Sequence, residues 1–283
     1  MKHLQYQATL RDALRFEGVG VHTGASSSVE IAPAPPGSGI VFVLAGGVRV
    51  PAAAEFVTET ARATVLGRDG VTVSTVEHLM AALFAMGIDN ATIAVDGPEV
   101  PVMDGSAKEF ADKIAERGVV SQNEVRNRLL ITAPHFFREG ERTLVVLPAS
   151  GLRVRFLADF APPIGTQFFD SDITPEVFVS EIAGARTFGY LHEVEALRKR
   201  GLAQGGTLEN AVVFGPDGPL TPLRWPDEVV RHKVLDLLGD LSLIGVYPQC
   251  EVIAIKSGHR LHCIATRELR KLLTPSLPSA KVR

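Results

Sequence analysis

The segment at residues 230–241, VRHKVLDLLGDL, carries side chains whose types and spacing could bind a metal ion. His232 and Asp236 lie four residues apart, and Asp240 follows after four more. On a helix this spacing places the three side chains on one face, so an imidazole and a carboxylate could reach the same ion, as in zinc-binding HExxH helices. The apolar residues also recur at helical spacing, so a solvated polar face of an amphipathic helix explains the pattern as well.

A zinc ion that keeps one position open for water needs a third protein ligand, and His78 in STVEHLMAAL is the best candidate. Its neighbour Glu77 could act as the general base that takes a proton from this water. The structural alternative is a capping box, with Ser74 at the helix N-cap and Glu77 at the third helical position.

Another histidine, His259 in KSGH, follows a predicted buried strand and a Ser-Gly turn. If Asp240 held its imidazole, His259 could stay protonated and serve as a general acid or as an electrostatic stabiliser. His262 and His192 have no such partner in the pattern, and we interpret both as surface residues. Lys233 is either a solvent-exposed charge or part of an anion site.

The elements that must position these residues repeat along the chain. The first half ends with a predicted helix, STVEHLMAALFAMG, a strand, NATIAVDG, and a helix, SAKEFADKIAERG. The second half ends in the same order, with PDEVVRHKVLDLLGDLSLIG, CEVIAIKSG and TRELRKLL. We therefore predict an α+β fold of two similar domains, residues 1–124 and 125–283, joined near GVVSQNEVRNRLL. Within the second, ARTFGYLHEVEALRKRGLAQGGT reads as a strand end, a helix and a Gly-rich turn, an insertion of the kind that often carries substrate contacts.

Composition limits the class of protein. The 283 residues are 46% hydrophobic and 22% charged, which is typical of a compact globular protein, and the net charge of -3 argues against a polyanion-binding protein. Cys250 and Cys263 cannot build a Cys-rich zinc site, so any metal must be held by histidines and carboxylates. Charges interrupt the start of the chain where a signal peptide needs an apolar core, and we expect a cytoplasmic protein that does not span a membrane.

Seven motifs in this order closely resemble the UDP-3-O-acyl-N-acetylglucosamine deacetylases, the zinc enzymes of the committed step of lipid A synthesis in Gram-negative bacteria: FEGVGVHTG, STVEHLMAAL, PVMDGS, ARTFG, QGGT, VRHKVLDLLGDL and KSGH. The match spans residues 16–259. The resemblance implies two domains, each a layer of helices on a small, mainly antiparallel sheet, with the active site between them.

The resemblance also implies a role for each matching residue. The ligands of one catalytic zinc ion are matched by His78, His232 and Asp236. Glu77 matches the family's catalytic base. His259, paired with Asp240, matches the group that stabilises charge and protonates the leaving amine. Thr187 matches the hydroxyl that helps hold the tetrahedral oxyanion. A substrate-contacting aromatic is matched by Phe188, and positions near the nucleotide-sugar are matched by Lys233, Gly206 and His22. The insertion over residues 187–207 corresponds to the passage for the 3-O-acyl chain.

The implied reaction is zinc-dependent hydrolysis of the N-acetyl group of UDP-3-O-(3-hydroxyacyl)-N-acetylglucosamine to acetate and a free amine. We expect no nucleic-acid partner and a monomer, with transient membrane proximity left open. A zinc amidohydrolase of a different amide and a non-catalytic binding module are the alternatives. The chain departs from the family after SGH, where RLHCIA replaces the usual aliphatic residue and Asn, so we expect the following helix to be anchored differently.

Overall fold

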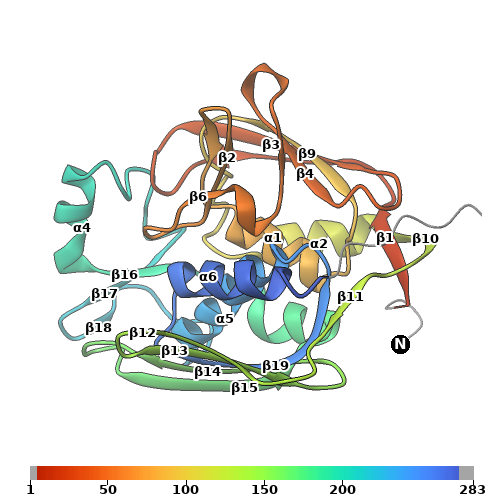
Figure 1. Cartoon of the computed structure of the whole chain (residues 1–283). Helices are drawn as coiled ribbons and strands as arrows, with labels where there is room; N and C mark the ends of the chain where they lie inside the picture. Colours follow the sequence, from red (N-terminus) through yellow and green to blue (C-terminus); the bar gives the residue numbers. More distant parts are fainter. Residues whose placement is uncertain (1–4, 274–283) are drawn as a thin grey trace, which may run out of the picture.

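The computed structural model describes residues 5–273, and in it the long helices lie between two large sheets (Figure 1). The first sheet has the strand order β2 (Leu14–Val19), β3 (Ser26–Pro33), β9 (Ala91–Asp96), β4 (Ile40–Val43), β5 (Arg49–Pro51). The second has the order β12 (His135–Glu139), β13 (Arg142–Pro148), β19 (Tyr247–Ile255), β14 (Leu152–Asp159), β15 (Thr166–Asp172), with β11 (Arg128–Leu130) beside β19.

The two sheets share one topology. In each, the last strand in chain order lies at the centre, antiparallel to the second strand and parallel to the third. The predicted α+β fold with two similar helix-on-sheet units is therefore confirmed. Residue 124 falls within β10 (Val119–Val125), which pairs with β1 (Tyr6–Leu10), and a domain division at this point stays a prediction.

Each sheet is covered by the helices that flank its central strand. These helices are α1 (Glu77–Ala85) and α2 (Lys108–Arg117) in the first half, and α5 (Glu228–Ser242) and α6 (His259–Arg270) in the second. The prediction that the last helix covers only TRELRKLL was wrong, because α6 already begins at His259. Its buried apolar residues Leu261, Ala265 and Leu269 recur every four positions, which is the helical period.

Helices α1 and α5 are buried on nearly all sides because they pack against each other as well as on their sheets. A glycine makes the contact possible: a Cβ atom at Gly239 would lie 2.1 Å from the carbonyl oxygen of Glu77. Gly239 therefore lets α5 touch the first residue of α1, and this contact brings the side chains of both helices together.

Smaller elements complete the rim of the molecule. A hairpin sheet contains β6 (Val57–Glu59), β7 (Val65–Arg68) and β8 (Val71–Val73), and another small sheet contains β16 (Phe188–Tyr190), β17 (Val212–Gly215) and β18 (Gly218–Pro219). The short helical turns are η2 (Ala45–Gly47), η3 (Ala54–Phe56), α3 (Pro175–Val177) and η4 (Phe178–Ile182). The predicted insertion is present as β16 and α4 (Leu191–Lys199), which lie at one side of the molecule (Figure 1).

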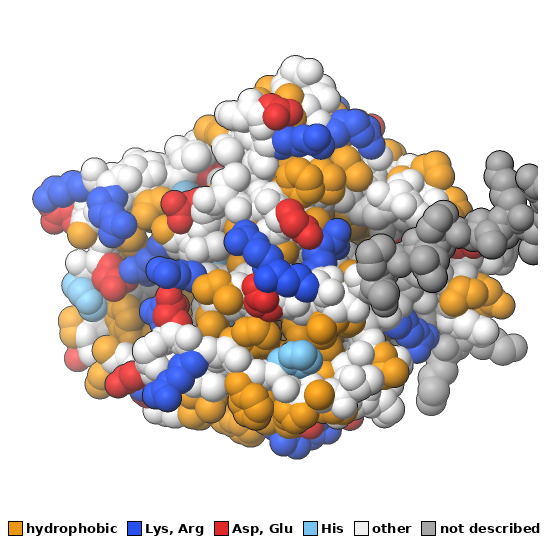
Figure 2. Space-filling model, in the orientation of Figure 1, with side chains coloured by type: hydrophobic (Ala, Val, Ile, Leu, Met, Phe, Trp, Pro, Cys, Tyr) orange, Lys and Arg blue, Asp and Glu red, His pale blue; other side chains and the backbone are white. Residues whose placement is uncertain are grey.

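One continuous apolar core joins the two halves, since its buried side chains come from both large sheets and from α1, α2, α5 and α6. On the face seen in Figure 2, basic and acidic side chains lie side by side, in keeping with the small net charge. Within residues 5–273 no helix combines the length and the apolar character needed to cross a membrane.

Candidate functional site

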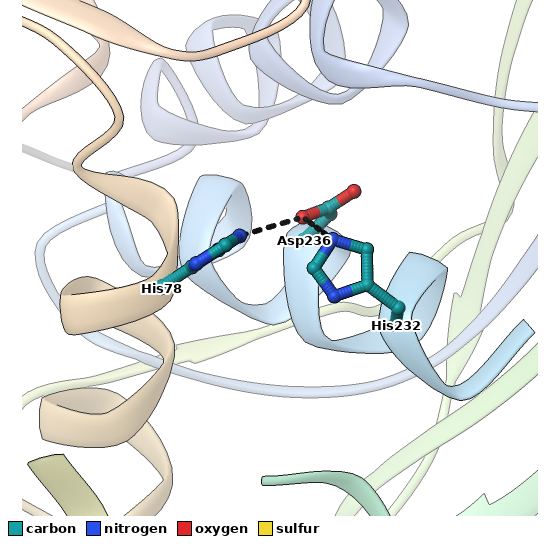
Figure 3. Close-up of side chains that lie close together, drawn as sticks. All are labelled: His78, His232 and Asp236. Carbon is teal, nitrogen blue, oxygen red and sulfur yellow. Dashed lines mark ion pairs between the residues drawn. The ribbon is translucent and has the colours of Figure 1, made fainter. Parts of the chain in front are cut away.

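Two histidines and one aspartate converge where α1 meets α5 (Figure 3). The Nε2 atoms of His78 and His232 lie 3.8 Å and 3.4 Å from the same oxygen, Oδ1 of Asp236. The three residues are at most 4% exposed. The alternative of a solvated polar face on α5 was therefore wrong: α1 covers this face.

The protonation of these groups follows from their surroundings. Burial lowers the pKa of His78 to about 3 and also lowers that of His232, so both rings are neutral. The Nδ1 of His232 donates to the carbonyl of Ala185 at 3.0 Å, which leaves its Nε2 lone pair directed at the cluster. Burial alone would raise the pKa of Asp236, but Lys233, whose Nζ donates to Oδ2 at 2.6 Å, and the nearby imidazoles lower it.

This donor set fits a zinc ion. Two neutral imidazole nitrogens and one carboxylate oxygen, all within 4.8 Å of one another, form the three-ligand set that leaves a coordination position open. Two further groups of side chains lie close enough together to hold a metal ion. One contains Glu77, Asp236 and His259 and shares Asp236 with this set. The other contains Asp240, His259 and His262.

Glu77 is the first residue of α1 and does not cap it. The N-cap is Val76, without a side-chain hydrogen bond, and the Ser74 hydroxyl donates to a different segment, so the capping-box alternative was wrong. Instead, Oε2 of Glu77 accepts from the backbone N–H of Thr64 at 3.0 Å, and Oε1 lies 4.0 Å from Nε2 of His259. Burial raises the pKa of Glu77 to about 8.

His259, the first residue of α6, is paired with Asp240 of α5: its Nδ1 lies 2.8 Å from Oδ2. Burial alone would lower the pKa of His259, but the carboxylates of Asp240 and Asp236 outweigh burial and raise it to about 9. Its Nε2 lies 3.8 Å from Asp236, so the protonated ring points at the cluster of His78, His232 and Asp236. The pair that the sequence suggested is therefore present in the structure.

Two residues of this network were not expected. The hydroxyl of Thr64 donates to Oδ1 of Asp240 at 2.5 Å, while its backbone holds Glu77. His262 was interpreted as a surface residue, and this was wrong: its ring is buried and its Nδ1 lies 2.9 Å from Oδ2 of Asp240. Thr64 carried no sequence signal, whereas His262 lies in the segment that departs from the family pattern.

Thr187 and Phe188 follow the Ala185 carbonyl in the chain, and Phe188 contacts the cluster. Main-chain bonds fix this segment: Thr187 N donates to the carbonyl of Gly105 at 2.7 Å, and its own carbonyl accepts from the next strand. The ring of Phe188 meets His232 edge-on, with centroids 6.0 Å apart, and meets Phe160 in the same way at 5.1 Å. These contacts place an apolar wall next to His232.

His22 and Gly206 come from loops of opposite halves that touch through their backbones. Gln204 N donates to the His22 carbonyl at 3.0 Å, and Gly205 N donates to Val21 at 3.1 Å. The loop of His22 is held by Glu99, which is 0% exposed and accepts from the backbone N–H of His22. Burial lowers the pKa of His22, so this ring is neutral.

Together these groups can hydrolyse an amide or ester. A metal ion at the ligand set would be an electrophile, a carboxylate with a raised pKa lies next to it as a base, and a protonated imidazole lies nearby as an acid. Ionisable groups with strongly shifted pKa values lying side by side are typical of active sites.

Comparison with known proteins agrees with this chemistry. A family model described as UDP-3-O-acyl N-acetylglycosamine deacetylase matches residues 7–271. Proteins named UDP-3-O-acyl-N-acetylglucosamine deacetylase are similar over most of their length. The Myxococcus xanthus protein is 48% identical, over 90% of this chain and 83% of its own length. The Nostoc sp. protein is 46% identical, over 90% of this chain and 95% of its own, and the Geobacter sp. protein is 44% identical, over 94% of this chain and 89% of its own. Since the family model spans nearly the whole chain and these relatives share close to half of its residues, the chain belongs to the UDP-3-O-acyl-N-acetylglucosamine deacetylase family.

Proposed function

We propose that this protein hydrolyses the N-acetyl group of UDP-3-O-(3-hydroxyacyl)-N-acetylglucosamine, releasing acetate and a free glucosamine amine, as the committed step of lipid A synthesis. The observation that carries the proposal is a buried ligand set whose Asp236 lies next to both a carboxylate with a raised pKa, Glu77, and an imidazole with a raised pKa, His259. The substrate is taken from the relatives, whose names state it.

The resident metal in this proposal is zinc, held by His78, His232 and Asp236. When bound, it supplies a Lewis acid that acidifies water and polarises an acyl carbonyl. Lys233 neutralises the second oxygen of Asp236 and thereby keeps this ligand ionised. The Ala185 carbonyl fixes the tautomer of His232.

Glu77 acts as the general base and takes the proton of the attacking water. Its pKa of about 8 makes the ionised carboxylate a strong proton acceptor, and the Thr64 backbone N–H holds one oxygen so that the other faces His259. The Thr187 hydroxyl donates a hydrogen bond to the developing oxyanion.

His259 donates a proton to the leaving amine, and Asp240 keeps its imidazole charged. The rate is expected to rise as Glu77 loses its proton and to fall as His259 loses its own, with limbs that belong to the coupled site. A one-base scheme, in which Glu77 passes its proton on to the amine, would remove the dependence on His259.

Substrate binding in this proposal uses residues from both halves. Phe188 contacts the substrate, Lys233 lies near the phosphates, and Gly206 and His22 border the nucleotide-sugar. The insertion over residues 187–207 forms the acyl passage. The protein works as a cytoplasmic monomer of two domains, residues 1–124 and 125–283.

The experiment that tests this function is incubation of the purified, zinc-loaded protein with the acylated UDP-N-acetylglucosamine, followed by measurement of acetate. We expect release that a chelator abolishes and added zinc restores. Equal turnover of a substrate without the acyl chain would favour a different amidohydrolase. Absence of release, with no stoichiometric metal in the protein, would favour a binding module.

A further inference from the structure

The Asp240 carboxylate has a donor on every side. It is 0% exposed, and its Oδ1 accepts from the Thr64 hydroxyl at 2.5 Å. Its Oδ2 is shared by two imidazoles, the Nδ1 of His259 at 2.8 Å and the Nδ1 of His262 at 2.9 Å. The proton donor of the proposed reaction and a second, deeper histidine therefore bind the same oxygen.

The second imidazole is itself fixed at its far end. The side chain of His262 is 0% exposed, its Nε2 lies 2.8 Å from the Ser257 hydroxyl, and the ring of Phe156 meets it edge-on. Burial lowers the pKa of His262, so the ring is neutral and carries one proton. Because an ionised Asp240 can only accept, this proton lies on Nδ1, and Nε2 accepts from the hydroxyl of Ser257.

We propose that His262 is a positioning residue for the reaction: with Ser257 behind it, it holds the shared oxygen of Asp240 in the one orientation that aligns His259. This inference rests on the proposed role of His259 as proton donor. It gives a function to one residue of RLHCIA, the segment that follows SGH.

The orientation of the Asp240 carboxylate matters because it sets the direction of the hydrogen bond to His259. Without the donor on His262, Oδ2 would lose one of its two partners, and fewer hydrogen bonds would resist rotation of the carboxylate about its Cβ–Cγ bond. The Nδ1 bond of His259 would follow that turn, and its Nε2 would move away from Asp236 and Glu77. Loss of outer partners of this kind costs about 10-fold to 100-fold in activity in metalloenzymes.

Two amide substitutions at position 262 test the roles of Nδ1 and Nε2 of His262 separately. In His262→Asn the amide reaches the position of Nδ1 and can still donate to Asp240. In His262→Gln the amide reaches the position of Nε2, so it can bind Ser257 and not Asp240. We expect His262→Gln to lower kcat about 10-fold or more with KM little changed and the zinc content intact, and His262→Asn to keep most of the turnover. His135→Gln, the same substitution on β12 and outside the network, is the control, and its kcat should equal that of the parent protein.

A double-mutant cycle tests whether His262 acts through His259. In a His259→Gln background the further change His262→Gln should leave kcat where it is, since the group to be aligned is gone. Equal kcat for His262→Gln and the parent protein would overturn the inference. So would a His262→Gln effect of full size in the His259→Gln background, or failure of His262→Asn to rescue.

An NMR measurement gives a readout that does not depend on turnover. Nitrogen-15 shifts of the imidazoles should show His262 neutral with its proton on Nδ1, and Ser257→Ala should move the signals of both His262 and His259. A proton on Nε2 of His262 would overturn the inference even in an active enzyme. If the parent protein released no acetate while these shifts were as expected, the proposed function would fail and the positioning of His259 would stand.

Discussion

Glu77 and His259 lie 4.0 Å apart and have pKa values shifted for different reasons. Burial disfavours the charge on the carboxylate, whereas two aspartates favour the charge on the imidazole. A carboxylate that binds a proton readily suits a base, and an imidazole that holds one suits an acid. At the scale of single residues, the roles proposed here therefore follow from surroundings as much as from residue type.

Glu77→Gln tests the base. The amide keeps the size of the side chain and the acceptor for Thr64 N–H, so zinc content should not change, while kcat for acetate release should fall by about 100-fold to 10,000-fold. Since burial of the charged carboxylate is unfavourable, the Tm should not fall either. Glu116→Gln, an exposed carboxylate on α2, is the matched control, and near-normal turnover of zinc-loaded Glu77→Gln would exclude the role of base.

The raised pKa of His259 predicts how stability depends on pH. Because its pKa increases from 6.5 to about 9 on folding, the folded protein binds this proton more tightly than the unfolded chain. The resulting stabilisation is complete below pH 6.5 and is lost as the pH rises to about 9. In metal-free protein the free energy of unfolding should fall across this window by roughly 3 kcal/mol more in the parent than in His259→Gln. Urea unfolding at several pH values measures the difference, and parallel curves would contradict the prediction.

Residue spacing predicted part of this site and missed the rest. His232 and Asp236 could be paired because they lie one turn apart on a helix. Thr64 could not, since its partner Asp240 is 176 positions away in the sequence and a threonine in a hairpin carries no signal of its own. The side chain of His262 was misplaced because the pattern offered it no partner: Asp240 lies 22 positions away in the sequence.

At the scale of elements, the approach of α1 to α5 decides the geometry of the site. One helix carries Glu77 and His78, and the other carries His232, Asp236 and Asp240. The sequence indicated both helices and their apolar residues correctly. It gave no reason for a glycine in the middle of α5, where glycine weakens a helix by about 1 kcal/mol relative to alanine.

Gly239→Ala should separate the two helices. The new methyl group would meet the Glu77 carbonyl oxygen at 2.1 Å, so overpacking of about 1–3 kcal/mol would outweigh the gain in helix propensity. We expect a lower Tm and a kcat reduced by about 100-fold, since displacement of catalytic groups by about 1 Å has effects of that size. Gly151→Ala, where a Cβ meets no atom within 4 Å, is the control. An unchanged Tm and kcat for Gly239→Ala would show that the contact is not needed.

At the scale of the whole molecule, the site belongs to neither half alone. The two large sheets have the same strand order, and the helices that cover them meet in one apolar core. The repeat along the sequence predicted this duplication. It did not predict the residue contacts across the interface, because those depend on how the two layers are rotated against each other.

A metal bridging the halves should stabilise the whole chain. At a free zinc concentration about 1,000 times its Kd, binding adds about 4 kcal/mol, which corresponds to a Tm increase on the order of 10 °C for a chain of this size. Removal of zinc by a chelator should reverse the increase in the parent protein and in the control Asp172→Asn. Asp236→Asn should show little response to either treatment. A parent Tm that does not respond to zinc would contradict a resident ion between the halves.

The loops that join the two halves at the rim do so through main-chain atoms, at Gly105 with Thr187, at His22 with Gln204 and at Val21 with Gly205. Bonds of this kind do not depend on which side chains the loops carry. The spacing between the halves can therefore survive extensive sequence drift, such as that separating this chain from relatives below 50% identity, as long as small residues persist where backbones touch. Residues that line the site can therefore change among relatives while the backbone frame that aligns its buried groups stays the same.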